Sequence, residues 1–112
     1  MRHKQITINI NNHKIICDEK IAPLIQNLNE QGFKTLFSCC NSPYVMIKMP
    51  KSKKQAKKFI QLVRKFYHDK PCREIIYNVF NHGLTIYMSN AKYSDKMKYH
   101  SYDEVPIPHD LQ

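Results

Sequence analysis

The segment 51–68 constrains the fold most strongly, because it carries the clearest helical pattern in the chain. Ser52 and Gln55 stand three residues apart and form a capping box, in which side chains satisfy backbone N–H groups at the start of a helix. Apolar residues then recur at helical spacing; they are Ala56, Phe59, Ile60, Val63, Phe66 and Tyr67. The segment therefore predicts an amphipathic helix with one face packed against a core.

The opposite face of this predicted helix is basic. Residues 48–70 hold nine Lys or Arg and one acid, Asp69, in a chain whose net charge is +9. Lysines crowd the first two turns, where the helix dipole favours acids, and Lys53 and Lys54 each stand four residues before another lysine. A face selected only for solubility would mix the two signs. We therefore expect an anionic partner, contacted by Lys51, Lys53, Lys54, Lys57, Lys58, Arg64 and Lys65.

The length and composition predict one globular domain. A chain of 112 residues with 42% hydrophobic residues is large enough for one modest core. Periodic patterns cover residues 1–90, which we predict to be a single domain. They are lost in residues 91–112, where tyrosines and prolines are spread among charges. This irregular C-terminal tail either packs along the sheet or reaches out as an arm, and its tyrosines favour packing.

No apolar run approaches the 18 residues of a membrane-spanning helix, and the N-terminus has no signal-peptide pattern. We therefore expect a cytoplasmic protein with no membrane partner and with its four cysteines reduced. The chain has two glycines in total and no glycine-rich phosphate loop, so no nucleotide cofactor is predicted.

The remaining patterns predict hairpins on either side of the two helices. Alternating apolar residues indicate strands at 5–10 and 13–17, joined by an Asn-Asn turn. A first helix is predicted at 19–31, with Asp18 as its cap and Gly32 as its C-terminal residue. Strands follow at 33–39 and 44–49, before the basic helix.

A third hairpin is predicted at 73–80 and 84–89, with Gly83 supplying a positive φ in its loop. The order is thus hairpin, helix, hairpin, helix, hairpin. This order predicts an α+β fold, with a mostly antiparallel sheet and both helices on one face.

Metal binding is not predicted. His13 and Cys17 share a spacing with His68 and Cys72, but residues four apart on a strand lie roughly 13 Å from each other. They cannot hold one ion, so no metal ligands are assigned. Catalysis is also not predicted, because no local signature gives Cys39 or Cys40 a histidine partner.

A sheet surface that binds bases is a second candidate. Tyr44, Tyr77 and Tyr87 are predicted to point outward, and on an open sheet face they could stack on nucleic-acid bases. Alternatively they cover the sheet or pack under the C-terminal tail, which is the interpretation that we favour.

Residues 18–39 resemble a pattern found in small uncharacterised proteins of phages and prophages. In that pattern a helix ends in Leu-Asn-x-x-Gly-Phe-x-Thr, here at residues 28–35, and a Ser-Cys strand end follows at 38–39. The segment 38–42 distantly resembles a Ser-Ser-Cys-Ser-Gly turn of the wybutosine-synthesis methyltransferases that act on tRNA. It lacks the glycine of that turn, and the chain is far too short for such an enzyme. The resemblance implies a phage or mobile-element origin and leaves the activity open.

Small size, concentrated charge and the lack of a catalytic set predict a binding protein rather than an enzyme. The leading hypothesis is a phage-type inhibitor of host defence, similar in role to an anti-CRISPR protein. Its basic helix would meet RNA, DNA, or an acidic or RNA-bearing effector protein. The alternative is a small RNA- or nucleotide-processing enzyme using Cys39 or Cys40, and a third hypothesis is a homo-oligomeric module.

Overall fold

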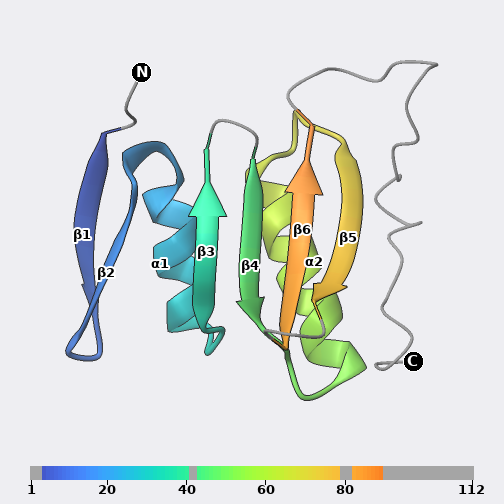
Figure 1. Cartoon of the computed structure of the whole chain (residues 1–112), viewed down its shortest axis with the longest axis horizontal. Helices are drawn as coiled ribbons and strands as arrows, with labels where there is room; N and C mark the ends of the chain where they lie inside the picture. The colour runs from blue at the N-terminus through green and yellow to red at the C-terminus, as the bar shows by residue number, and fades with distance from the viewer. Residues whose placement is uncertain (1–3, 41–42, 79–81, 90–112) are drawn as a thin grey trace.

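The fold is known from a computed structural model that describes residues 4–40, 43–78 and 82–89. Six strands and two helices follow the predicted order (Figure 1). The strands are β1 (Gln5–Ile10), β2 (His13–Asp18), β3 (Thr35–Cys39), β4 (Tyr44–Lys48), β5 (Cys72–Asn78) and β6 (Gly83–Met88). The helices are α1 (Ala22–Glu30) and α2 (Lys53–Phe66). The α+β prediction is confirmed, while the predicted tail at 91–112 lies outside the described residues.

The strands form two antiparallel sheets rather than one. One sheet contains β1 and β2, and the other has the order β3-β4-β6-β5. Both helices lie behind this divided layer, on the same face (Figure 1). The core lies between the helices and the strands, and its fully buried members include Leu28, Val45, Phe59 and Ile86.

The β1–β2 hairpin depends on its two asparagines. Asn11 and Asn12 have φ values of 49° and 68°, so both central residues of the turn are left-handed. Two-residue hairpins favour this conformation because it matches the twist of the strands, and asparagine tolerates it better than most residues. The predicted hairpin is confirmed.

Helix α1 ends as predicted but begins differently. Gly32 has φ 94°, and its N–H donates to the carbonyl of Asn29 at 3.1 Å. The N–H of Phe33 donates to Leu28 at 3.0 Å, which completes a Schellman motif. At the other end a short 3-10 turn, Glu19–Ile21, precedes the helix, and Asp18 makes no capping bond. The predicted Asp18 cap is wrong, because its carboxylate accepts a hydrogen bond from Cys40 instead.

A bulge changes the faces of β3. The register shifts between Thr35 and Phe37, so these two residues point to opposite sides of the sheet rather than to the same side as predicted. Thr35 faces α1, where its hydroxyl accepts a hydrogen bond from Asn29 at 3.0 Å. Phe37 faces away from the helices.

Helix α2 begins with the predicted cap. The Ser52 hydroxyl accepts a hydrogen bond from the N–H of Gln55 at 3.2 Å, and the Gln55 side chain accepts one from the N–H of Lys51 at 3.3 Å. The apolar stripe packs into the core as expected, except at Phe66. Phe66 is 36% exposed. Its ring packs edge-on against that of the buried Tyr67, with the two ring centroids 4.9 Å apart.

The β5–β6 hairpin is confirmed, but its glycine has another role. The left-handed residue beside the turn is His82, with φ 47°, whereas Gly83 has no positive φ. A Cβ atom at Gly83 would collide with the side chain of Met46 on the neighbouring strand β4. Glycine at this position therefore allows close packing across the sheet. Within the described residues, no helix is long and apolar enough to cross a membrane.

Candidate anion-binding surface

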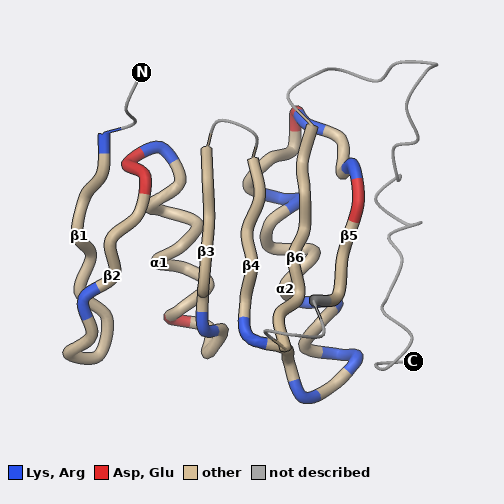
Figure 2. Tube along the Cα trace, in the orientation of Figure 1, with Lys and Arg blue, Asp and Glu red and all other residues tan. Residues whose placement is uncertain are grey.

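The packing of α2 turns its lysines outward. Ala56, Phe59, Ile60 and Val63 face the sheet and are almost fully buried. Basic residues therefore recur along the opposite side of the helix, and its tube in Figure 2 carries no acidic segment. Six lysines on or beside this side are exposed, and we call them the α2 lysine surface: Lys51, Lys53, Lys54, Lys57, Lys58 and Lys65.

No acidic side chain of the described part of the chain neutralises this surface. The ion pairs found there are Lys4 with Glu19 at 3.2 Å and Arg73 with Glu74 at 3.5 Å, and neither involves α2. The first turn of α2 contains no acid, although the positive end of the helix dipole lies there. The lysines therefore repel one another and the dipole, and both repulsions would be relieved by an anion.

Arg64 does not belong to this surface, so its predicted contact with a partner is corrected. Only 8% of Arg64 is exposed. It follows Ile60 by four residues and precedes Tyr67 by three, so it lies beside two buried members of the apolar stripe. Its side chain lies at Cys72, whose pKa is raised by burial and lowered in part by the charge and hydrogen bond of Arg64. Arg64 is therefore buried beside Cys72 and is not part of the exposed α2 lysine surface.

The tyrosines divide between the two faces of the sheet. Tyr44 and Tyr87 are paired across β4 and β6 on the helix-free face, with ring centroids 5.6 Å apart. The guanidinium of Arg73 lies 5.2 Å from the centre of the Tyr87 ring. Tyr77, in contrast, pairs with the buried Leu84 and therefore lies on the helix side. The predicted set of three outward tyrosines is thus reduced to two.

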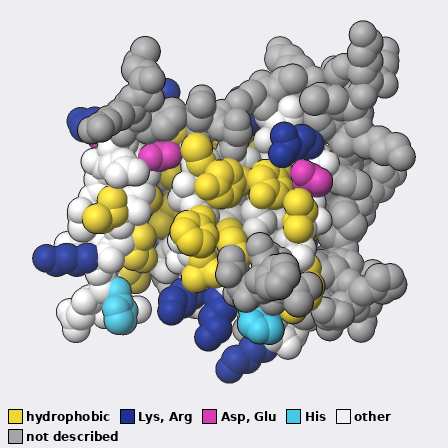
Figure 3. Space-filling model, viewed as in Figure 1, with side chains coloured by type: hydrophobic (Ala, Val, Ile, Leu, Met, Phe, Trp, Pro, Cys, Tyr) yellow, Lys and Arg dark blue, Asp and Glu magenta, His cyan; other side chains and the backbone are white. Residues whose placement is uncertain are grey.

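The helix-free face also carries exposed apolar residues that the sequence did not predict. Hydrophobic side chains gather in the centre of this face (Figure 3). Phe37 is 60% exposed and Ile76 is 40% exposed. The bulge in β3 places Phe37 there, and simple alternation along the strand gives no signal of such a shift.

The cysteines are reduced thiols with little sign of activation. Cys17 and Cys72 are buried, whereas Cys39 and Cys40 are half-buried. Burial raises the pKa of Cys40, and the hydrogen bond and negative charge of Asp18 raise it further. A nucleophilic cysteine requires a lowered pKa, so the shift at Cys40 has the opposite direction. Among the described residues, no three His, Cys, Asp or Glu side chains cluster as metal ligands.

Comparison of the chain with protein-family models, with curated proteins and with solved structures finds no match.

Proposed function

We propose that the protein binds nucleic acid through the α2 lysine surface. The observation that carries this proposal is the group of six exposed lysines without an ion pair to any described residue. Five of the six lie in or just before the first two turns of α2, where positive charges destabilise the helix. A bound anion would offset this destabilisation, because it would neutralise the repulsion among the lysines and between the lysines and the helix dipole.

The chemistry of the surface favours contacts with phosphates over recognition of bases. Lysine ammonium groups bind phosphates as point charges, and such contacts position a nucleic acid without reading its sequence. Binding should therefore be tolerant of sequence and sensitive to salt. If four to six lysines engage a duplex, the plot of log affinity against log salt should have a slope of about −4 to −5.

The test is fluorescence anisotropy of labelled single-stranded RNA and duplex DNA across a salt series. The triple variant Lys54→Glu, Lys57→Glu, Lys58→Glu should lose most of the binding and most of the salt dependence. A matched control changes the same charge elsewhere, with Lys14→Glu, Lys20→Glu and Lys34→Glu, which are exposed and lie outside α2. The control should retain binding more strongly than the α2 variant.

Equal losses in the two triple variants would contradict the proposal, because net charge alone would then explain the binding. No binding of either nucleic acid at low salt would also contradict it and would direct attention to an acidic protein surface. The wider role expected from the sequence, inhibition of a nucleoprotein defence effector in a phage-infected cell, stays a prediction.

A further inference from the structure

The two sheets are separated by a seam between β2 and β3. The strands run parallel, because their first residues line one cavity and their ends are joined by Asp18 and Cys40 (Figure 1). No backbone–backbone hydrogen bond joins β2 to β3 within the described ranges. Two open cavities follow the seam, one of about 450 Å³ at the start of the strands and one of about 170 Å³ further along.

The seam exposes hydrogen-bonding groups of β2. The N–H of Glu19 donates to Lys4 at 2.8 Å, which places Gln5 and Asp18 in a non-hydrogen-bonded pair of the β1–β2 ladder. Bonded and non-bonded pairs alternate in an antiparallel ladder. Lys14 and Ile16 therefore also stand in non-bonded pairs, with their N–H and C=O groups directed away from β1 and toward the seam.

The opposite side of the seam offers the matching edge of β3. The N–H of Lys48 donates to Lys34 at 2.8 Å, next to the Thr35–Ile47 pair. By the same alternation, the backbone groups of Thr35 point away from β4 and into the seam. The N–H of Cys40 also points there and reaches Asp18.

Two exposed apolar side chains flank the seam. Ile16 on β2 is 69% exposed and Phe37 on β3 is 60% exposed, and both line the smaller cavity. Ile15 and Cys17 pack against the core, so Ile16 lies on the helix-free face, as Phe37 does. The seam thus combines unpaired strand edges with apolar surface on one face.

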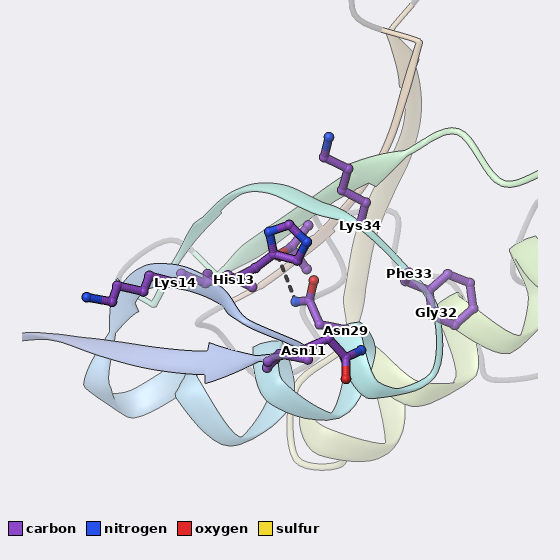
Figure 4. Close-up of a pocket in the computed structure, with 10 residues that line it drawn as sticks. Asn11, His13, Lys14, Asn29, Gly32, Phe33 and Lys34 are labelled. Atoms are coloured by element: carbon purple, nitrogen blue, oxygen red, sulfur yellow. Dashed lines mark hydrogen bonds between the residues drawn. The ribbon is translucent and has the colours of Figure 1, made fainter.

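The end of the seam that contains the larger cavity is positively charged. Lys14 and Lys34 lie on opposite sides of the larger cavity, with Asn29 between them (Figure 4). Asn29 is held in place, because its amide donates to the carbonyl of Ile25 at 2.8 Å and to Thr35 at 3.0 Å. No acidic residue lines this cavity among the described residues.

We propose that the seam binds an extended acidic peptide of a partner protein. The peptide adds a strand to the edge of β2, with main-chain hydrogen bonds to Lys14 and Ile16. Lys14 and Ile16 stand two residues apart on β2 and share one face. The side chains on the matching face of the peptide are therefore apolar where they contact Ile16 and Phe37, and acidic further along the strand, near Lys14 and Lys34. This proposal is independent of nucleic-acid binding by α2.

The test is selection from a random library of linear peptides on the full-length protein. Enriched peptides should alternate apolar residues and carry acids. Their binding should slow amide hydrogen exchange at Lys14 and Ile16. The variant Ile16→Pro should weaken binding about tenfold, which corresponds to the loss of one or two hydrogen bonds. Its N–H makes no bond to β1, so the hairpin should survive the substitution.

Four further variants make the test specific. Ile16→Ser retains the N–H and should weaken binding less than Ile16→Pro. Ile76→Ser removes an exposed apolar side chain of β5 and should have no effect. The triple glutamate variant of α2 should still bind the peptides, whereas the variant at Lys14, Lys20 and Lys34 should not.

Failure to enrich any peptide would overturn the proposal, and so would peptides that slow exchange only outside the seam. Slowed exchange at Lys14 and Ile16 by single-stranded RNA, without any peptide that does the same, would assign the seam to another class of ligand. The exchange measurement uses the unaltered protein, so these outcomes remain decisive even if Ile16→Pro does not fold.

Discussion

The carboxylate of Asp18 accepts a hydrogen bond from the backbone N–H of Cys40 at 3.1 Å, which fastens the end of β2 to the end of β3. Asp18 is only 7% exposed. A hydrogen bond to a buried charged group contributes more to stability than a neutral one. The contact therefore holds together two sheets that share no backbone ladder among the described residues.

Replacing Asp18 by alanine should lower the free energy of unfolding by about 1.5–3 kcal/mol, because the N–H of Cys40 would lose its acceptor. Asp18→Asn should cost less, since the amide oxygen can still accept. Urea unfolding measures both variants. The control is Glu19→Ala, which removes an exposed acid paired with Lys4 and should cost less than about 1 kcal/mol. If Asp18→Ala and Glu19→Ala lowered the free energy of unfolding equally, the hydrogen bond from Cys40 to Asp18 would not have the stabilising role given to it.

Arg64 and Lys65 are neighbours in the sequence with opposite roles, so their alanine variants should separate stability from binding. Arg64→Ala removes a buried side chain beside Cys72 and should destabilise the protein by about 1–3 kcal/mol, with little change in RNA affinity at temperatures where it remains folded. Lys65→Ala should change stability by less than about 0.5 kcal/mol and weaken RNA binding. Denaturant unfolding measures the stability of each variant, and fluorescence anisotropy measures its affinity for RNA. If Arg64→Ala weakened RNA binding without loss of stability, Arg64 would instead belong to the contact surface.

The charges at the start of α2 should reduce stability in the absence of a partner. Lys53→Glu with Lys54→Glu places acids at the positive end of the helix dipole, so the free energy of unfolding should rise by about 1 kcal/mol at low salt. The same variant should bind RNA more weakly. Thermal unfolding at low and high salt measures the first effect, which should shrink as salt screens the charges. A less stable variant would show that the lysines make favourable contacts in the free protein.

Tyr67 should make the fold sensitive to alkali. Its pKa is raised from 10 to about 12, chiefly by burial, with contributions from the negative charges that Cys40, Cys39 and Asp18 would carry. Because the neutral phenol is favoured in the folded state, its contribution to stability is complete below pH 10. It is lost as the pH rises toward about 12, and the loss amounts to about 2–3 kcal/mol.

Urea unfolding across this alkaline range measures the loss, and tyrosinate absorbance follows the ionisation. Tyr67→Phe should make the stability fall less steeply with pH, because that side chain cannot ionise. Identical pH dependence in the two proteins would contradict the assignment.

The thiols should react in two classes. Cys39 and Cys40 are half-buried and should be modified by an alkylating reagent before Cys17 and Cys72, which are buried. The rate at Cys40 should rise only at alkaline pH, since its pKa is raised above 9. Replacing both half-buried cysteines by serine should leave nucleic-acid binding unchanged. Rapid modification of Cys40 at neutral pH would instead favour the alternative of an enzyme with a cysteine nucleophile.

The sequence predicted those parts of the fold that are determined locally. The asparagine turn, the glycine at the end of α1 and the cap of α2 each depend on residues within a few positions of one another. The periodicity of α2 also located its apolar stripe, but it could not show how far the sheet extends on either side of that stripe. Arg64 and Phe66 lie at the two margins of the stripe; Arg64 is buried beside Cys72, while Phe66 is left partly exposed.

The seam could not be predicted because it depends on contacts between distant segments. Local patterns predicted each hairpin, yet they could not show whether β2 pairs with β3, because α1 separates these two strands in the chain. Asp18 has the sequence features of a helix cap, and its carboxylate is instead used 22 residues away at Cys40. The bulge in β3, which exposes Phe37, likewise depends on its register with β4.

The strand order also has a consequence for how the chain reaches its native state. Among the described residues, three of the four strand pairings join neighbours in the chain. The fourth joins β4 to β6, and its paired residues Tyr44 and Tyr87 are far apart in the sequence. Hairpins close quickly, whereas a distant pairing must first overcome the entropy of closing a long loop. We expect the three hairpins to form early and the β4–β6 ladder last. Pulsed hydrogen exchange during refolding would then show the amides between these two strands becoming protected after all the others.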